Sequence, residues 1–221
     1  MQISVQSNIR QVTRFLDDVQ KKQIPFAASR ALNDIAFKVS RREMPELAQR
    51  VFDKGATSFT KRGFKYKKSN KRDLTAIVFI DEQQGEYMKF QVAGGTRFPN
   101  KKALLISTDQ SKLNRYGNFT QAQLARIIND KQKFFKGIPK GRSGKNYEGI
   151  WERYGRAASA TSGGKRIRMV ARYADKAQYR PLFPFGKHTE KVVFARKGGF
   201  TDTFNRRLKQ ALASAKNKPR R

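Results

Sequence analysis

The stretch IPFAASRALNDIAFKVSRREMPELAQRVF, residues 24–52, decides the N-terminal part of the fold. Its apolar residues recur at the spacing of one helix face, at Ile24, Ala27, Ala28, Ala31, Leu32, Ile35, Ala36 and Val39. Pro25 suits the first turn of a helix, where a missing N–H costs nothing. Pro45 is expected to kink or restart the helix, because it cannot donate a backbone hydrogen bond and crowds the preceding turn. The stretch predicts a helix over about 25–51, with a shorter helix over about 8–21 before it.

The middle of the chain changes to strand-like composition. Residues 53–63 are rich in Gly, Ser and Thr and predict a loop. Runs of β-branched and aromatic residues predict strands at 64–68, 74–80, 103–107, 149–154, 166–174 and 178–185. Helices are expected at 86–95, ending at Gly94, and at 120–131, capped by Thr120. Helical spacing returns over 188–215, with a break at Gly198.

This order of elements predicts an α+β fold rather than alternating βα units. We expect one integrated domain in three regions: N-terminal helices over 1–52, a strand-rich core with an inserted helix over 53–185, and a C-terminal helix with a basic tail over 186–221. Three segments of the core, 53–72, 131–148 and 156–166, are expected to project as extended arms, because they are basic or rich in Gly and Ser.

The charge of the chain is strongly unbalanced. Its 221 residues hold 49 Lys and Arg against 17 Asp and Glu, a formal net charge of +32. Self-repulsion on this scale opposes compaction unless a partner supplies negative charge. Apolar residues still make up 38%, so a folded protein is expected. The absence of Cys excludes disulfides and thiolate metal sites, and no apolar run is long enough to predict a membrane span or a membrane partner.

The sequence offers little catalytic chemistry. His188 is the only histidine, so neither a two-His metal site nor a triad with a spare His can be built. The pairs Gly144-Lys145 and Gly164-Lys165 lack the spacing of a phosphate-binding loop. The acidic group at 81–86 reads as solvated surface carboxylates. We therefore expect no enzyme, no metal and no cofactor.

Basic residues gather in clusters that lack acids. The two strongest candidates for contact with an acidic partner or with DNA lie in the first two expected arms: Lys61, Arg62, Lys65, Lys67, Lys68, Lys71 and Arg72, then Lys131, Lys133, Lys136, Lys140, Arg142 and Lys145. Similar clusters occupy 165–180, in which Asp175 is the only acid, and 206–221, which has none. Aromatic residues interleave them, which suits base stacking but equally suits strands with an aromatic inner face and a lysine outer face. Both interpretations of the aromatics stay open.

The order of several motifs resembles a family of phage proteins. The motifs are IPFAASRALNDIAF, VFDKGATSFTKRGFKYKKSN, LTAIVFI, GGTRFPNKKALLI, GNFTQAQL and GIWERY, together covering about residues 20–155. They resemble minor structural proteins of tailed bacteriophages, of the tail-completion, neck or head–tail joining type that includes the lambda-like minor tail protein Z. In that family a helix of the form P-x-A-x-x-x-A-L-N precedes a basic segment. Its positions are matched here by Pro25, Ala27, Ala31, Leu32 and Asn33.

The resemblance implies a non-enzymatic ring subunit, commonly in six or twelve copies, at the neck or tail of a virion assembled in the bacterial host cytoplasm. Its implied partners are copies of itself and acidic virion proteins such as the portal, adaptor or tail tube, with genomic DNA in the lumen as a further contact. The alternative from composition alone is a basic protein that binds DNA or RNA without sequence specificity. No zinc-finger spacing, RNA-recognition signature or dimer seam behind a basic region favours a dedicated nucleic-acid reader.

Overall fold

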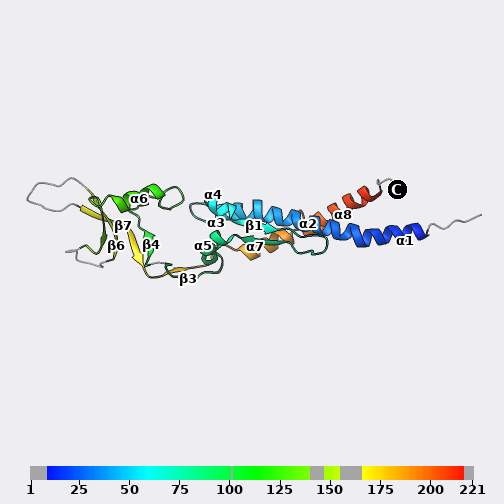
Figure 1. Ribbon diagram of the computed structural model, residues 1–221, viewed down its shortest axis with the longest axis horizontal. Helices are drawn as coiled ribbons and strands as arrows, with labels where there is room; N and C mark the ends of the chain where they lie inside the picture. The colour runs from blue at the N-terminus through cyan, green and yellow to red at the C-terminus, as the bar shows by residue number, and fades with distance from the viewer. Residues whose placement is uncertain (1–8, 101, 140–146, 155–165, 217–221) are drawn as a thin grey trace, which may run out of the picture. The chain divides into compact units, whose positions relative to one another are not determined.

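The computed structural model describes residues 9–100, 102–139, 147–154 and 166–216 (Figure 1). It combines helices with antiparallel sheets, which confirms the α+β class. The chain forms two compact units instead of one integrated domain. The helical unit comprises 1–51, 57–88 and 183–221, and the sheet unit comprises 52–56 and 89–182. The expected region 53–185 is therefore divided, because 57–88 fold with both helical ends of the chain.

The helical unit begins with one continuous helix. Its parts are α1 (Ile9–Asp18), η1 (Val19–Gln23), α2 (Ile24–Lys38), η2 (Val39–Glu43) and α3 (Met44–Val51). The π turns η1 and η2 end one residue before Ile24-Pro25 and Met44-Pro45.

The helix therefore does not start at Pro25 as expected but continues from Ile9, while near Pro45 the α-helical pattern is interrupted by η2 and resumes at Met44. A proline inside an α-helix lacks an N–H and its ring clashes with the carbonyl four residues back. In η1 and η2 the N–H groups of Ile24 and Met44 instead bond the carbonyls of Val19 and Val39, five residues back. The wider turn accommodates the proline, so the helix continues.

Helix α8 (Phe200–Lys216) packs along α2. The small residues Ala27 and Ala31 of α2 are buried and allow a close approach. Arg207 Nε lies 2.6 Å from Asp34 Oδ2, and this hydrogen bond raises the pKa of the Arg207 guanidinium. Lys38 Nζ donates to the Gly198 carbonyl at 3.2 Å, next to the expected break before α8. The expected C-terminal helices are confirmed.

A hairpin and three shorter helices complete the helical unit. They are α4 (Ser58–Arg62), β1 (Phe64–Lys67), β2 (Ile77–Ile80), the first part of α5 (Glu82–Ala93) and α7 (Phe185–Val193). The loop expected at 53–63 contains α4, which Thr57 caps by accepting from the Thr60 N–H. Strands β1 and β2 pair antiparallel. Phe64 is fully buried against Phe183, with ring centroids 5.6 Å apart.

The sheet unit holds four antiparallel strands in the order β4-β7-β6-β5. They are β4 (Leu104–Ser107), β7 (Arg166–Ala174), β6 (Gly149–Tyr154) and β5 (Phe134–Gly137). A separate pair joins β3 (Gly95–Arg97) to β8 (Ala177–Tyr179). The expected strand at 178–185 therefore ends at Tyr179, because α7 begins at Phe185.

Helix α6 (Gln121–Asn129) covers one face of this sheet. The expected cap is confirmed, since the Thr120 hydroxyl accepts from the Gln123 N–H and the Gln123 side chain accepts from the Thr120 N–H. Ile127 of α6 is buried with Ile150 and Val170 of the sheet. A local core thus fixes α6 over β6 and β7.

Candidate functional site

Among the described residues of the sheet unit, Glu152 is the most deeply buried charged residue. Its side chain is only 10% exposed and accepts from two cations. Arg168 Nε lies 2.7 Å from Oε2, and Lys133 Nζ lies 3.2 Å from Oε1. Burial alone opposes ionisation, but the hydrogen bonds and positive charges of Arg168 and Lys133 outweigh it and lower the pKa of Glu152. The carboxylate is therefore held ionised.

Strand register brings together the triad of Glu152, Arg168 and Lys133. Glu152 on β6 lies opposite Arg168 on β7 and opposite Phe134 on β5. Lys133 directly precedes β5, and its N–H donates to the Asp130 carboxylate at 3.0 Å after the end of α6. Residues distant in sequence thus meet through antiparallel pairing.

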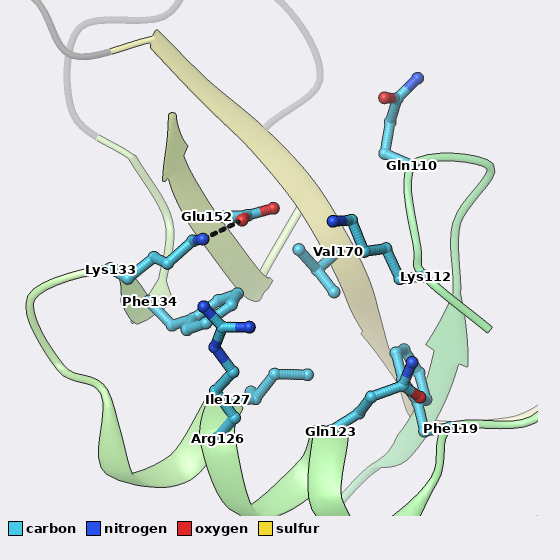
Figure 2. Close-up of a pocket in the computed structure, with 10 residues that line it drawn as sticks. All are labelled: Gln110, Lys112, Phe119, Gln123, Arg126, Ile127, Lys133, Phe134, Glu152 and Val170. Atoms are coloured by element: carbon cyan, nitrogen blue, oxygen red, sulfur yellow. Dashed lines mark ion pairs between the residues drawn. The ribbon is translucent and has the colours of Figure 1, made fainter. Parts of the chain in front are cut away.

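A cavity of about 150 Å³ opens beside this triad, between α6 and the sheet (Figure 2). Its lining comes from α6, from the strands and from the loops after β4 and before β5: Gln110, Lys112, Phe119, Gln123, Arg126, Ile127, Lys133, Phe134, Glu152 and Val170. Ligand pockets for larger molecules span roughly 300–1,000 Å³, whereas a cavity of about 150 Å³ accepts a single benzene ring. The space therefore fits one ring or one side chain.

A bulge in β7 holds the loop that forms one wall. Ile150 lies opposite Ala171 while Trp151 lies opposite Met169, so Val170 is the extra residue. Its carbonyl accepts from the Thr108 N–H at 3.3 Å and from the Ser111 hydroxyl. The Val170 carbonyl thereby anchors the loop that carries Gln110 and Lys112.

Two cations at the cavity lack an acidic partner. The side chains of Lys112 and Arg126 are exposed and make no hydrogen bond or ion pair with any residue that the structure describes. The whole sheet unit holds 22 Lys and Arg against six Asp and Glu, a formal charge of +16. The cavity therefore lies in a strongly positive field.

The structure places the two predicted basic clusters in different units. In the first cluster, Lys65 pairs with Asp81 at 2.6 Å. Ser69 lies between Lys68 and Lys71 and bonds Ser29 and Asn33 of α2. The segment 64–69 therefore packs on the long helix instead of projecting as an arm, because its strand and these buried hydrogen bonds hold it.

The remaining members of the first cluster are more exposed. Lys71 Nζ lies 5.1 Å from the centre of the Phe26 ring, and Arg62 bonds the Ser58 carbonyl. The side chain of Lys61 is half-buried, and those of Lys67, Lys68 and Arg72 are exposed.

Among the described residues of the second cluster, only Lys133 lines the cavity. Lys131 and Lys136 are exposed. Lys136 lies on β5, which is the edge strand of the sheet, so 134–137 does not project as an arm. Lys140, Arg142 and Lys145 lie outside the described residues, as does most of the expected arm at 156–166.

Sequence reasoning missed most of the cavity. Glu152, Lys112 and Arg126 were not among the predicted site residues. One signal existed: alternation places Glu152 on the same face of its strand as the apolar Ile150. Isolated cations such as Lys112 and Arg126 carry no such signal.

The packing interpretation holds for several aromatics of the basic clusters. Phe64 is fully buried, and Phe134 and Tyr173 pack on the sheet core. Phe135 differs, since the Arg153 guanidinium lies 4.5 Å from the centre of its ring. An aromatic inner face thus explains most of the alternation that the sequence shows.

No cluster of three or more potential metal ligands occurs among the described residues. Within the same residues, no helix combines the length and the apolar character that crossing a bilayer would need. Comparison of the chain with protein-family models, with curated proteins and with solved structures found no significant match.

Proposed function

We propose that this protein is a non-enzymatic structural component of a tailed-phage virion, forming an oligomeric ring at the neck or tail that joins or completes the head–tail assembly. The motifs described above carry the phage part of the proposal. The ring part rests on one surface of the helical unit, the outer face of the β1–β2 hairpin.

This hairpin face combines apolar and positive side chains. Ile77 and Phe79 are 48% and 39% exposed. The register places Lys67 opposite Ile77 and Lys65 opposite Phe79, so all four share one face. Exposed apolar residues rimmed by charge are typical of protein contacts. The face therefore suits a neighbouring subunit.

The wider surface has the same character. Sixteen large apolar side chains are exposed among the described residues, while seven of the 19 buried apolar residues are alanines. In a ring, each face meets a different surface of the next copy, so like charges need not meet. Glu82 and Glu86, one turn apart on α5, are exposed acids that form no ion pair with any described residue, and they supply charges complementary to the lysines.

The test is the mass of the native assembly, measured at about 0.5 M salt, where the repulsion between exposed charges is largely screened. We expect a closed oligomer, which Ile77→Asp with Phe79→Asp converts to monomer. Leu74→Asp is the control, because Leu74 is equally exposed but precedes β2. Charge reversal adds a second test: Lys67→Glu and Glu86→Lys should each weaken assembly and together restore it. A wild-type chain that stays monomeric throughout contradicts the ring.

The second candidate is a basic protein that binds DNA or RNA without sequence specificity. The observation favouring it is the stacking of Arg153 on Phe135 and of Arg172 on Tyr147, at 4.5 and 5.3 Å from the ring centres. Such a protein should bind unrelated oligonucleotides equally, with affinity falling steeply as salt rises. Fluorescence anisotropy measures this. Tight, salt-sensitive binding by a monomer would favour this candidate over the ring.

A further inference from the structure

We propose that the cavity between α6 and the sheet binds one apolar or aromatic side chain of an acidic peptide segment of a partner protein. The carboxylates of that segment are held by Lys112 and Arg126. This inference rests on the proposed function in one respect, the acidic virion partner, and it names the chemistry by which such a partner is recognised.

The interior of the cavity selects an apolar group. Phe119, Ile127, Phe134 and Val170 form the walls that lie against the sheet core. The volume of about 150 Å³ limits the occupant to one ring or one branched side chain. Anchors of this kind, seated in a desolvated pocket, supply most of the binding energy in protein complexes.

The rim selects negative charge beside that group. Glu152 is the one acid of the lining, and Lys133 and Arg168 already neutralise it. Lys112 approaches from the loop after β4 and Arg126 from α6 (Figure 2). Both side chains are exposed and unpaired among the described residues, so an incoming carboxylate meets two hydrated cations and displaces no internal partner.

The same cations could hold a phosphate, but the walls favour a peptide. Single-stranded nucleic acid is bound by aromatic faces exposed in series along a basic groove. Here Phe119 and Phe134 are half-buried, pack on the sheet core, and line one small pocket that is open on one side. A single pocket with charges at its mouth fits a side-chain anchor flanked by acids, and its two rings do not form a series of exposed faces for successive bases.

The test uses a fluorescein-labelled peptide, Glu-Asp-Glu-Phe-Glu-Asp-Glu, with the full-length protein at about 0.15 M salt, where charges beyond about 8 Å are screened. Fluorescence anisotropy should report saturable binding. Replacing the central Phe of the peptide by Ala should weaken it about tenfold or more, because the anchor is lost. An equally charged oligothymidylate is the competitor that reports nucleic-acid binding.

Two protein variants separate the cavity from the general positive field. Lys112→Glu with Arg126→Glu should weaken the peptide about tenfold or more, since both rim contacts become repulsive. Lys102→Glu with Lys176→Glu changes the net charge equally in the same unit, at exposed positions outside the cavity, and should weaken it less than about threefold. All four positions are exposed, so both variants should fold, which circular dichroism checks.

Four outcomes overturn the inference. Equal binding of the Phe and Ala peptides means that only charge is recognised. Equal losses in the two protein variants place the site elsewhere. Stronger competition by oligothymidylate than by unlabelled peptide assigns the cavity to nucleic acid. If no peptide binds while the wild-type chain still forms a ring, this inference fails and the proposed function stands. If the peptide binds while the wild-type chain stays monomeric, the proposed ring fails and this inference stands.

Discussion

Replacing Glu152 by Gln should destabilise the sheet unit by about 2 kcal/mol. Hydrogen bonds to a charged group contribute about 1.5–3 kcal/mol, against about 0.5–1.5 for neutral ones. Glu152 makes two, with Arg168 at 2.7 Å and Lys133 at 3.2 Å. The cost stays below the roughly 3–5 kcal/mol of a fully buried pair, because Arg168 and Lys133 are 29% and 37% exposed and water solvates them after the change.

The single tryptophan makes this measurable. Trp151 neighbours Glu152 on β6 and is only 6% exposed, so its fluorescence reports on the sheet unit. With a urea slope of about 2 kcal/mol/M, the midpoint should fall by about 1 M. Glu148→Gln is the control, since it removes the same charge from an exposed side chain just before β6. Equal shifts in the two variants would mean that the loss of one negative charge, and not the contacts with Arg168 and Lys133, lowers the stability.

The same pair of variants has a defined pH dependence. The pKa of Glu152 is lower in the folded protein than its ordinary value of 4.5. Its contribution to stability is therefore present above that value, and it is lost as the pH falls through the folded pKa. The stability difference between wild type and Glu152→Gln should shrink when the urea titration is moved from pH 7 to below 4.5. A constant difference would mean that the carboxylate is not held ionised by its neighbours.

Three further changes test the packing of the two units. Ile35→Asp should lower the free energy of unfolding by about 3 kcal/mol or more, because Ile35 is buried on α2. Arg41→Asp, at an exposed position, is the control and should be tolerated. Thermal unfolding followed by circular dichroism compares the two variants. Gly149→Ala should cost about 1–3 kcal/mol by Trp fluorescence, since an added Cβ would collide with the Ala171 carbonyl. Thr120→Ala should cost about 1 kcal/mol in the same assay through loss of the cap of α6.

Local signals predicted most of the elements. Thr120 followed by Gln123 marks the start of α6, and both hydrogen bonds of the capping box are present. Gly94 ends α5 with a φ of +73°, which only glycine adopts without strain. These features depend on neighbours within a few residues, so the sequence carries them directly. The sequence does not show that the helix continues through Pro45, because a π turn has no simple sequence pattern.

The cavity could not be predicted, for a physical reason. Its walls depend on the pairing of β6 with β7, whose register shifts at Val170, and on the Val170 carbonyl, which accepts from the loop carrying Lys112. Each of these steps joins residues tens of positions apart. The residue types alone could not distinguish Lys112 from the many other lysines of the chain.

A place in a dense basic cluster does not by itself leave a lysine unpaired. Lys65 and Lys133 belong to the densest clusters, yet each is paired with an acid of its own unit. Lys112 and Arg126 stand apart from the clusters and have no acidic partner among the described residues. A cation that already neutralises a buried acid loses that interaction when it turns to a ligand, whereas a hydrated, unpaired cation beside an apolar cavity does not. Unpaired cations next to apolar surface, such as Lys67, Lys112 and Arg126, should thus carry the specific contacts.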